Sequence, residues 1–190
     1  WSSDVCSSDL GDARAAASAG WAEVVGVNWR VSHRFDPAAA TIADRHYNRQ
    51  KVGTPQFVPP GRCLVLLAEG PALWVTSWPR YVKHRWPGAW VCSAFRREGG
   101  DPASQLIRDA VAATRWRWPE IPPLGMVTFL DRDHVRPTKV RGKSVWGWTW
   151  LRAGFEPDGE TEGGLLAFRL APDRMPEPEA PTGAQLRLLP

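Results

Sequence analysis

The side chains best suited to chemistry stand together in the stretch DPAAATIADRHYNRQKVGTPQFVPPGR, residues 36–62. His46 can take a proton from an amine near neutral pH, and Tyr47 can donate a hydrogen bond to a carbonyl or a ring nitrogen. Arg49, three residues after His46, shares its helical face and could hold a phosphate. The three side chains predict a site for proton transfer beside an anion. The alternative is structural: a buried histidine, hydrogen-bonded to backbone, beside a packed tyrosine.

A helix over residues 37–50 is expected to position these groups. Asp36 is a favourable N-cap, and the proline that follows it suits the first helical position. At helical spacing, the apolar stripe that includes Ile42 ends on His46 and Tyr47. A loop rich in proline follows, so the helix is predicted to deliver both rings to an open end of the fold.

Asp131 is a further catalytic candidate because it follows the strand expected over residues 124–130. Ligands of open α/β sheets gather at the carboxyl ends of strands, so this carboxylate could orient His46 or accept a proton from a target amine. The alternative is that Asp131 caps the loop after the strand. His84 and His134 lie in Arg-rich loops and are expected in solvent, and the spacing of the histidines predicts no metal site.

The remaining elements alternate in an order that predicts a mixed sheet. Strands are expected over residues 22–31, 62–68, 72–78, 89–95, 124–130 and 164–170, with another strand opened by Phe155, and helices over 37–50, 102–118 and 144–154. One strand, helix and strand, between residues 89 and 130, have the length of a right-handed parallel crossover. We predict an α/β (α+β) fold: a mostly antiparallel sheet of about six to seven strands, a central β-α-β crossover, and helices on both faces.

Bulk composition sets wider bounds. Residues 1–10, WSSDVCSSDL, resemble the translation of a sequencing-adapter oligonucleotide, and we expect them to be an artefact rather than a signal peptide. Two cysteines remain without them, with neither a disulfide framework nor metal-type spacing, which favours the cytoplasm. Removing Asp4 and Asp9 raises the formal net charge from +4 to +6, which favours a polyanionic partner. No apolar run approaches the ~20 residues of a membrane span.

We expect one domain over residues 22–171. An uninformative Ala- and Gly-rich segment, 11–21, precedes it, and a disordered, proline-rich tail, 172–190, follows it. Tryptophan is unusually frequent, and eleven of the twelve lie outside the adapter-like segment. Core packing is the favoured interpretation, and the alternative is a set of flat surfaces that stack a base.

The order of elements, with Ala153, Gly154 and Phe155 near its end, resembles the fold of the GCN5-related N-acetyltransferases (GNAT). In that family acyl-CoA binds where the fourth strand splays from the fifth, and its pyrophosphate lies on a glycine-rich turn that opens the central helix. The corresponding turn is RREGGDPAS, residues 96–104. The resemblance implies an acetyl-CoA or other acyl-CoA site on Ser93, Ala94, Phe95, Arg96, Arg97, Gly99, Gly100, Ala103 and Ser104.

Two residues depart from the family pattern. Asp101 stands where the turn expects a small residue, and a carboxylate there would repel phosphate; a plain turn before a helix is the alternative. Trp150 stands where many members of the family have a tyrosine that protonates the leaving thiolate, and an indole is no proton source near neutral pH. The acid and the base must then come from other residues.

The sequence His46-Tyr47-Asn48-Arg49, after a first strand, is similar to the Mom-type DNA-modification proteins of bacteriophages. These atypical GNAT relatives add a small acetamide-like group to adenine N6 in duplex DNA. The resemblance implies a DNA partner, and two basic segments, 79–88 and 131–143, could then follow the DNA backbone. Their cations are Arg80, Lys83, Arg85, Arg132, Arg136, Lys139, Arg141 and Lys143, and the side chains that could stack a flipped base are Trp78, Trp86 and Trp148. A solvated charged surface is the alternative.

The sequence therefore predicts a cytoplasmic, GNAT-like transferase of phage or prophage type that modifies a nucleobase, with acyl-CoA as donor and DNA as partner. One alternative is an N-acetyltransferase that acts on a small amine or a protein. Another is a non-catalytic nucleic-acid-binding module on a degenerate transferase scaffold.

Overall fold

The computed structural model describes residues 27–58, 60–79, 81–82 and 84–183. The adapter-like segment 1–10, the segment 11–21, the start of the expected first strand, residues 184–190 and the two cations Arg80 and Lys83 lie outside the described residues.

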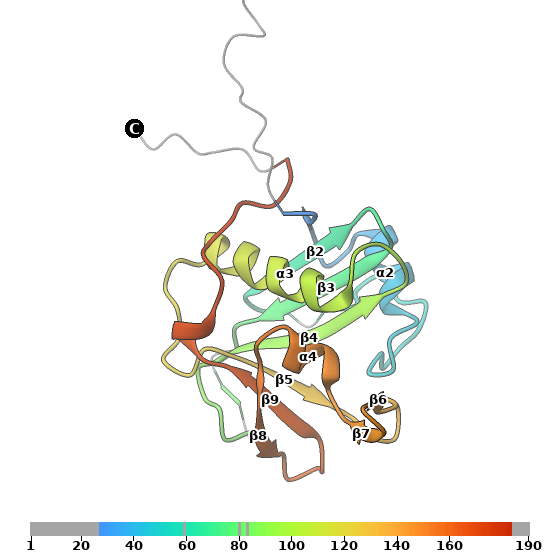
Figure 1. Ribbon diagram of the computed structural model, residues 1–190. Helices are drawn as coiled ribbons and strands as arrows, with labels where there is room; N and C mark the ends of the chain where they lie inside the picture. Colours follow the sequence, from blue (N-terminus) through green and yellow to red (C-terminus); the bar gives the residue numbers. More distant parts are fainter. Residues whose placement is uncertain (1–26, 59, 80, 83, 184–190) are drawn as a thin grey trace, which may run out of the picture.

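Seven strands form one sheet in the order β1-β2-β3-β4-β5-β9-β8, and a two-stranded hairpin, β6–β7, is separate (Figure 1). The strands are β1 (Arg30–Ser32), β2 (Cys63–Ala68), β3 (Ala72–Ser77), β4 (Trp90–Arg97), β5 (Met126–Leu130), β6 (Thr138–Val140), β7 (Lys143–Val145), β8 (Glu156–Glu160) and β9 (Leu166–Leu170). The helices are α2 (Pro37–Ala43), α3 (Ala103–Arg117), α4 (Trp148–Arg152) and the short 3-10 helix η1 (Pro172–Arg174). The predicted mixed, mostly antiparallel sheet is confirmed.

Among the strands of the described residues, only β4 and β5 pair in parallel, and α3 lies between them in the chain. Their pairing is short: Trp90, Val91 and Cys92 face Met126, Val127 and Thr128, and the register stops there. Beyond that point β4 stays paired with β3, and β5 stays paired with β9. The two strands therefore separate toward their carboxyl ends.

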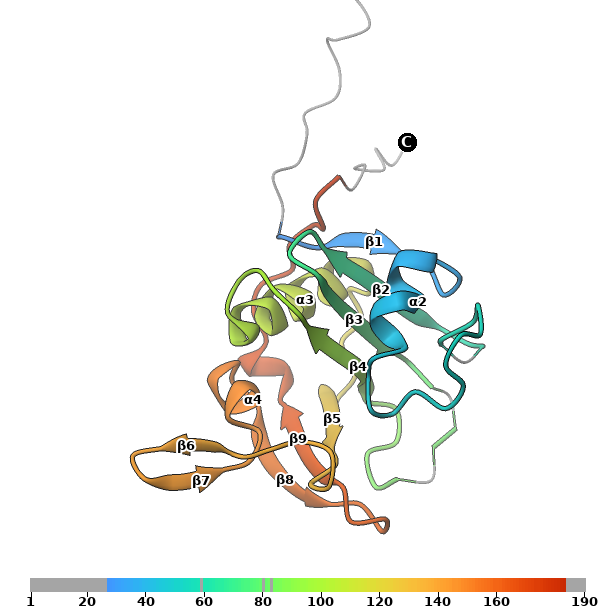
Figure 2. The ribbon, with the colours of Figure 1, turned by 90° about the vertical axis from the view of Figure 1, so that its right-hand side faces the viewer.

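Side chains of β2 alternate between two apolar clusters, as a strand covered on both faces requires. Leu64 and Leu66 pack in the cluster that holds the buried side of α3, together with Trp74 and Trp90. Val65 and Leu67 pack in the cluster that holds the buried residues of α2. Figure 2 shows α2 lying over β2 and β3.

Most described tryptophans fill the core, as the favoured interpretation expected. Those with less than a tenth of their surface exposed are Trp29, Trp74, Trp86, Trp90, Trp118 and Trp150. Trp86 packs against Phe129, so its expected role as an exposed stacking platform is wrong. Trp78 and Trp148 are half-buried, and an arginine lies over the ring of each.

Three element boundaries differ from the sequence prediction. The helix expected over 37–50 ends at Ala43, because the Asp44 carboxylate accepts hydrogen bonds from Gly53 and Arg49 and so turns the chain back on itself. The hairpin β6–β7 occupies the end of the polar loop expected over 131–143 and the start of the helix expected over 144–154, which is confined to Trp148–Arg152. The first strand is confined, within the described residues, to Arg30–Ser32.

The expected disordered tail is wrong for residues 172–183. After η1, the side chains of Met175 and Ala180 are buried. Thr182 donates its N–H to the Trp29 carbonyl at 2.8 Å and its hydroxyl to the Val27 carbonyl at 2.6 Å. Contacts with distant residues thus order a segment whose composition alone indicated disorder.

Gly125, which precedes β5, makes the tightest backbone approach in the fold. Its φ is +70°, and a Cβ added there would lie 2.1 Å from the Leu170 carbonyl oxygen. Gly142 has a similar φ of +79° but no atom within 4 Å of the corresponding point. Gly142→Ala should therefore cost only the left-handed backbone strain, about 1–2 kcal/mol.

Gly125→Ala should lower the free energy of unfolding by more than Gly142→Ala, because β5 must also move away from β9. Urea denaturation of both variants measures the difference. Equal losses would contradict the close approach at Gly125.

Candidate functional site

The candidate site is the cleft that opens where β4 and β5 separate. A cavity of about 180 Å³ lies there, lined by the turn after α2, both strands, the start of α3 and α4. Its lining residues are His46, Tyr47, Cys92, Ser93, Ala94, Phe95, Ala103, Thr128, Phe129, Leu130, Val135, Thr149 and Trp150. His46 and Tyr47 therefore open into the same cavity between the two parallel strands.

Two side chains attach the turn after α2 to the separated strands. Asn48 Nδ2 donates to the Ser93 carbonyl of β4 at 2.7 Å, and the Asn48 N–H donates to His46 Nδ1 at 3.3 Å within the turn. Tyr47 Oη donates to the Phe129 carbonyl of β5 at 3.3 Å. Backbone carbonyls of β4 and β5 thus form hydrogen bonds with this turn where the two strands are no longer paired.

The two rings continue into a stack with His134, whose side chain is exposed, as the sequence analysis expected. The His46 and Tyr47 ring centroids are 4.6 Å apart, and those of Tyr47 and His134 are 5.5 Å apart with 14° between the planes. Asp131 Oδ2 lies 2.9 Å from His134 Nδ1. Asp131 therefore orients His134 and not His46, which corrects the expected pairing.

His134 is the site residue that the sequence analysis missed. The Asp131 carboxylate also accepts the Asp133 N–H at 2.9 Å, so the expected cap of the following loop is present as well. The signal in the sequence was the spacing of three residues between Asp131 and His134, directly after a buried strand.

Burial sets the protonation states of the two central rings. Loss of water lowers the pKa of His46, and the nearby Arg96 charge lowers it further against the effect of a hydrogen bond with Asn48. Tyr47 is 39% exposed overall, yet desolvation raises its pKa. Backbone and His134 hydrogen bonds lower the pKa of Asp131. At neutral pH the site therefore holds a neutral imidazole, a protonated phenol and an ionised carboxylate.

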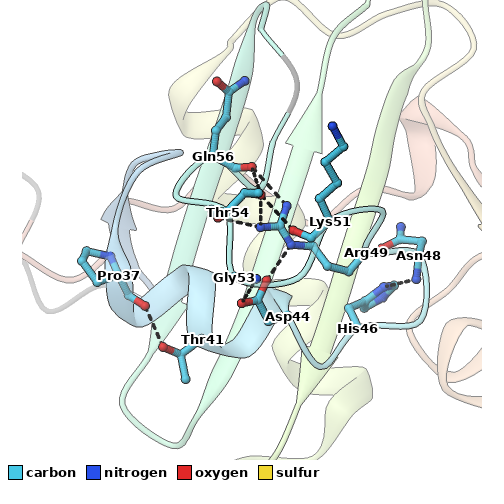
Figure 3. Close-up of polar contacts among 10 residues, drawn as sticks. All are labelled: Pro37, Thr41, Asp44, His46, Asn48, Arg49, Lys51, Gly53, Thr54 and Gln56. Carbon is cyan, nitrogen blue, oxygen red and sulfur yellow. Dashed lines mark hydrogen bonds and ion pairs between the residues drawn. The ribbon is translucent and has the colours of Figure 1, made fainter.

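Arg49 has a structural role instead of the expected catalytic or phosphate-binding one (Figure 3). Its Nε donates to Asp44 Oδ1 at 2.6 Å, and its two other nitrogens donate to the carbonyls of Thr54 and Gln56 at 2.7 and 3.1 Å. Only 9% of the side chain is exposed. The guanidinium therefore fastens the loop over residues 48–58 and does not reach the stacked rings.

That loop covers a second, larger cavity of about 360 Å³ on the sheet. His46, Ser93 and Ala94 line it as well as the cleft. One imidazole and one stretch of β4 therefore form the wall between two cavities.

The residues expected to hold acyl-CoA divide into two groups. Ser93, Ala94, Phe95 and Ala103 line the cleft, and Ser104 follows Ala103 in the first turn of α3. Arg96 and Arg97 turn elsewhere: Arg96 contacts Glu98 and the Arg45 carbonyl, and Arg97 donates to the carbonyls of Gly100 and Asp101.

The two glycines of the expected phosphate turn have a packing role. A Cβ on Gly70 would lie 2.5 Å from Gly100 Cα, so the turn lies directly against the β2–β3 connection, and Gly99 faces Pro71. The Asp101 carboxylate accepts a hydrogen bond from Asn28 at 2.6 Å and lines a cavity other than the cleft. Asp101 is not among the residues that line the cleft, so its carboxylate is not placed to repel a phosphate there.

The described basic residues differ in their partners. Arg85 and Arg132 contact carboxylates of β8, Asp158 at 3.8 Å and Glu160 at 2.5 Å. The cations with exposed positions on the β6–β7 hairpin and its approach are Arg136, Lys139, Arg141 and Lys143. The hairpin extends away from the sheet (Figure 2) and begins shortly after His134.

Among the described residues, no three His, Cys, Asp or Glu side chains are placed to hold a metal ion. No helix in that part of the chain is long and apolar enough to cross a membrane. Comparison with protein-family models, curated proteins and solved structures finds no match. Function is therefore inferred from the geometry of the site.

Removing the Arg49 guanidinium should loosen the loop over residues 48–58. Arg49→Ala removes one of the donors to the Asp44 carboxylate and the guanidinium bonds to two carbonyls, so the melting temperature should fall and amide exchange within residues 50–58 should speed up. Hydrogen–deuterium exchange with mass spectrometry measures this. Val52→Ala, in the same loop and 68% exposed, is the matched control. Unchanged exchange in Arg49→Ala would contradict the structural role.

Protonation of His46 should destabilise the fold. Its folded pKa lies below the unfolded value of about 6.5, so between these two pKa values the unfolded chain binds more protons than the folded one. The contribution of neutral His46 to the free energy of unfolding is complete above about pH 6.5 and is lost as the pH falls below that value. The drop in melting temperature between pH 7.5 and 5 should be smaller in His46→Gln than in the wild type. The exposed His33, changed to Gln, is the control, and identical drops in all three proteins would refute the desolvated state of His46.

Proposed function

We propose that the protein is a GNAT-like transferase that uses acetyl-CoA, or another acyl-CoA, to modify a nucleobase amino group in DNA. The observation that carries the proposal is the cleft between β4 and β5, into which His46 and Tyr47 both open. The two parallel strands separate around a cavity that has a base and an acid at its mouth. This arrangement suits the transfer of a group from an extended acyl-CoA donor to an amine.

We propose the GNAT-like form of this fold, with a central β-α-β crossover and helices on both faces of the sheet. The parallel pair β4–β5 with α3 between its strands supports a central crossover. The division of β2 side chains between the α2 cluster and the α3 cluster supports helices on both faces of the sheet. The first turn of α3 has no side-chain cap, and the positive end of the helix suits an anionic group of the donor.

Each step of the transfer is assigned to a group whose protonation state fits it. The amine nitrogen forms a bond to the donor carbonyl carbon while the carbon–sulfur bond breaks. Neutral His46 takes the proton that the amine loses, and the Tyr47 hydroxyl, kept protonated by its raised pKa, supplies a proton to the departing thiolate. Tyr47 thus fills the role of acid that Trp150 cannot.

His134 and Asp131 are positioning residues in this scheme. The carboxylate holds the His134 imidazole, and that ring stacks on Tyr47, as His46 does. The phenol thereby packs against two imidazole rings. The exposed cations of the β6–β7 hairpin lie close to His134 in the chain and suit a DNA backbone at the same end of the cleft.

The proposal predicts a modified nucleoside in DNA from cells that express the protein. Nucleoside mass spectrometry should detect the adduct, and His46→Ala should reduce it by about 100-fold or more, the usual contribution of a general base. Tyr47→Phe should reduce it as well. His33→Ala, a histidine outside the cleft, should leave it unchanged.

Acetyl-CoA should raise the melting temperature of the purified protein, because a ligand of the folded state stabilises it. Unmodified DNA despite this stabilisation would overturn the nucleobase acceptor and point to another amine. DNA binding with a steep salt dependence, without an adduct or an effect of acetyl-CoA, would overturn the transferase and favour a non-catalytic binding module.

A further inference from the structure

We propose that the cavity beneath the loop 48–58 is the acceptor pocket, and that it selects an uncharged amino group on a planar heteroaromatic ring over an alkylammonium group. This inference rests on the proposed function and names the class of its acceptor. The residues that bear on it are Asn48, Gln50, Lys51, Gln56 and Phe57 of the loop, with His46 at one end.

The size of the cavity fits one ring system. Its volume of about 360 Å³ lies at the low end of the range for small-molecule pockets, roughly 300–1,000 Å³. A base pair or a folded peptide would not enter it. A base of duplex DNA could reach it only after rotation out of the stack, as enzymes that modify bases require.

The position of the cavity places its ligand next to the proton acceptor. His46, Ser93 and Ala94 line both this cavity and the β4–β5 cleft. A donor in the cleft and an acceptor in the cavity would therefore meet at the same imidazole, from two sides. The desolvation that lowers the pKa of His46 keeps that imidazole neutral and able to take the proton.

The charges around the cavity discriminate between two kinds of amine. Arg49 and Lys51 line it, and its described lining contains no aspartate or glutamate. Alkyl amines have a pKa near 10.4 and enter as cations, which need a carboxylate partner. The amino groups of adenine and cytosine are uncharged at neutral pH, and no such partner is needed. The lining therefore disfavours lysine side chains and polyamines.

The remaining side chains suit a flat, hydrogen-bonding ligand. Asn48 Nδ2 donates to the Ser93 carbonyl and Gln56 Nε2 donates to the Val58 carbonyl at 2.9 Å, so both amides are held in place by backbone. An amide anchored through its nitrogen presents its oxygen as an acceptor for an exocyclic amine. Phe57 is half-buried against the sheet and offers a ring for stacking.

The pocket is also held in shape before a ligand arrives. Arg49 donates to the carbonyls of Thr54 and Gln56, on either side of Pro55, and is itself bound to Asp44. The loop is thus fastened to the end of α2, and little ordering is left for the ligand to impose.

Binding measured without any acyl donor tests the pocket. Titration of the ¹⁵N-labelled full chain with 9-methyladenine should shift amide signals of residues 48–58, and spermidine and Nα-acetyl-lysine amide should not shift them at similar concentration. Phe57→Leu keeps an apolar side chain but loses the flat ring, and should weaken 9-methyladenine binding by about tenfold or more. Tyr81→Leu, at a 92% exposed aromatic position outside the pocket, should bind as the wild type does.

A charge reversal at Lys51 provides a second test of the pocket. Lys51→Glu should allow spermidine to bind, because it removes one cation and adds a carboxylate at the pocket wall. The proposal would be overturned if Phe57→Leu bound 9-methyladenine as tightly as the wild type. It would also be overturned if spermidine shifted the same amide signals in the wild type. The absence of any shift with 9-methyladenine in a protein whose melting profile is intact would overturn it as well.

Failure of the pocket and failure of the proposed function give different results. If DNA is modified in cells but 9-methyladenine does not contact residues 48–58, the pocket is overturned and the transferase stands. If the base binds as predicted but neither an adduct nor an effect of acetyl-CoA is found, the transferase is overturned and the pocket stands.

Discussion

The whole site depends on one unmet requirement for hydrogen bonds. β4 and β5 pair over only three residues each and then part, which leaves backbone groups of both strands without partners in the sheet. The turn after α2 supplies partners through Tyr47 and Asn48. An apolar stripe on α2 brings this turn to the sheet, and the separation of the strands decides where it binds. The cleft, the ring stack and the second cavity all follow from that contact.

Structural and chemical roles therefore coincide in the same side chains. The packing that places Tyr47 and His46 in the cleft also removes water from their rings, and that loss of water keeps the imidazole neutral and the phenol protonated. The bond between Arg49 and Asp44 fixes the loop over residues 48–58. The imidazole consequently belongs to two cavities at once, which is the arrangement that a transfer between two ligands needs.

Periodicity and turn residues were sufficient for much of the scaffold. The helix α3, the strands β2 to β5 and the terminal hairpin lie close to their predicted ranges, because each has a regular apolar pattern between clear breaks. Composition misled for residues 172–183, since prolines and charges do not indicate the burial of Met175 and Ala180. Helical spacing likewise predicted an α2 that is too long, because the hydrogen bonds from Arg49 and Gly53 to Asp44 form only when the loop is folded.

The amino-acid sequence by itself determined which groups could act as base, acid and cation, and on which local elements most of them lie. Only the tertiary structure decided their partners: Asp131 binds His134 instead of His46, Arg49 binds its own loop, and Tyr47 reaches a carbonyl 82 residues away. The reason is physical. Local patterns report the periodicity of single elements, whereas contacts between distant residues depend on strand order, register and the point at which two paired strands separate.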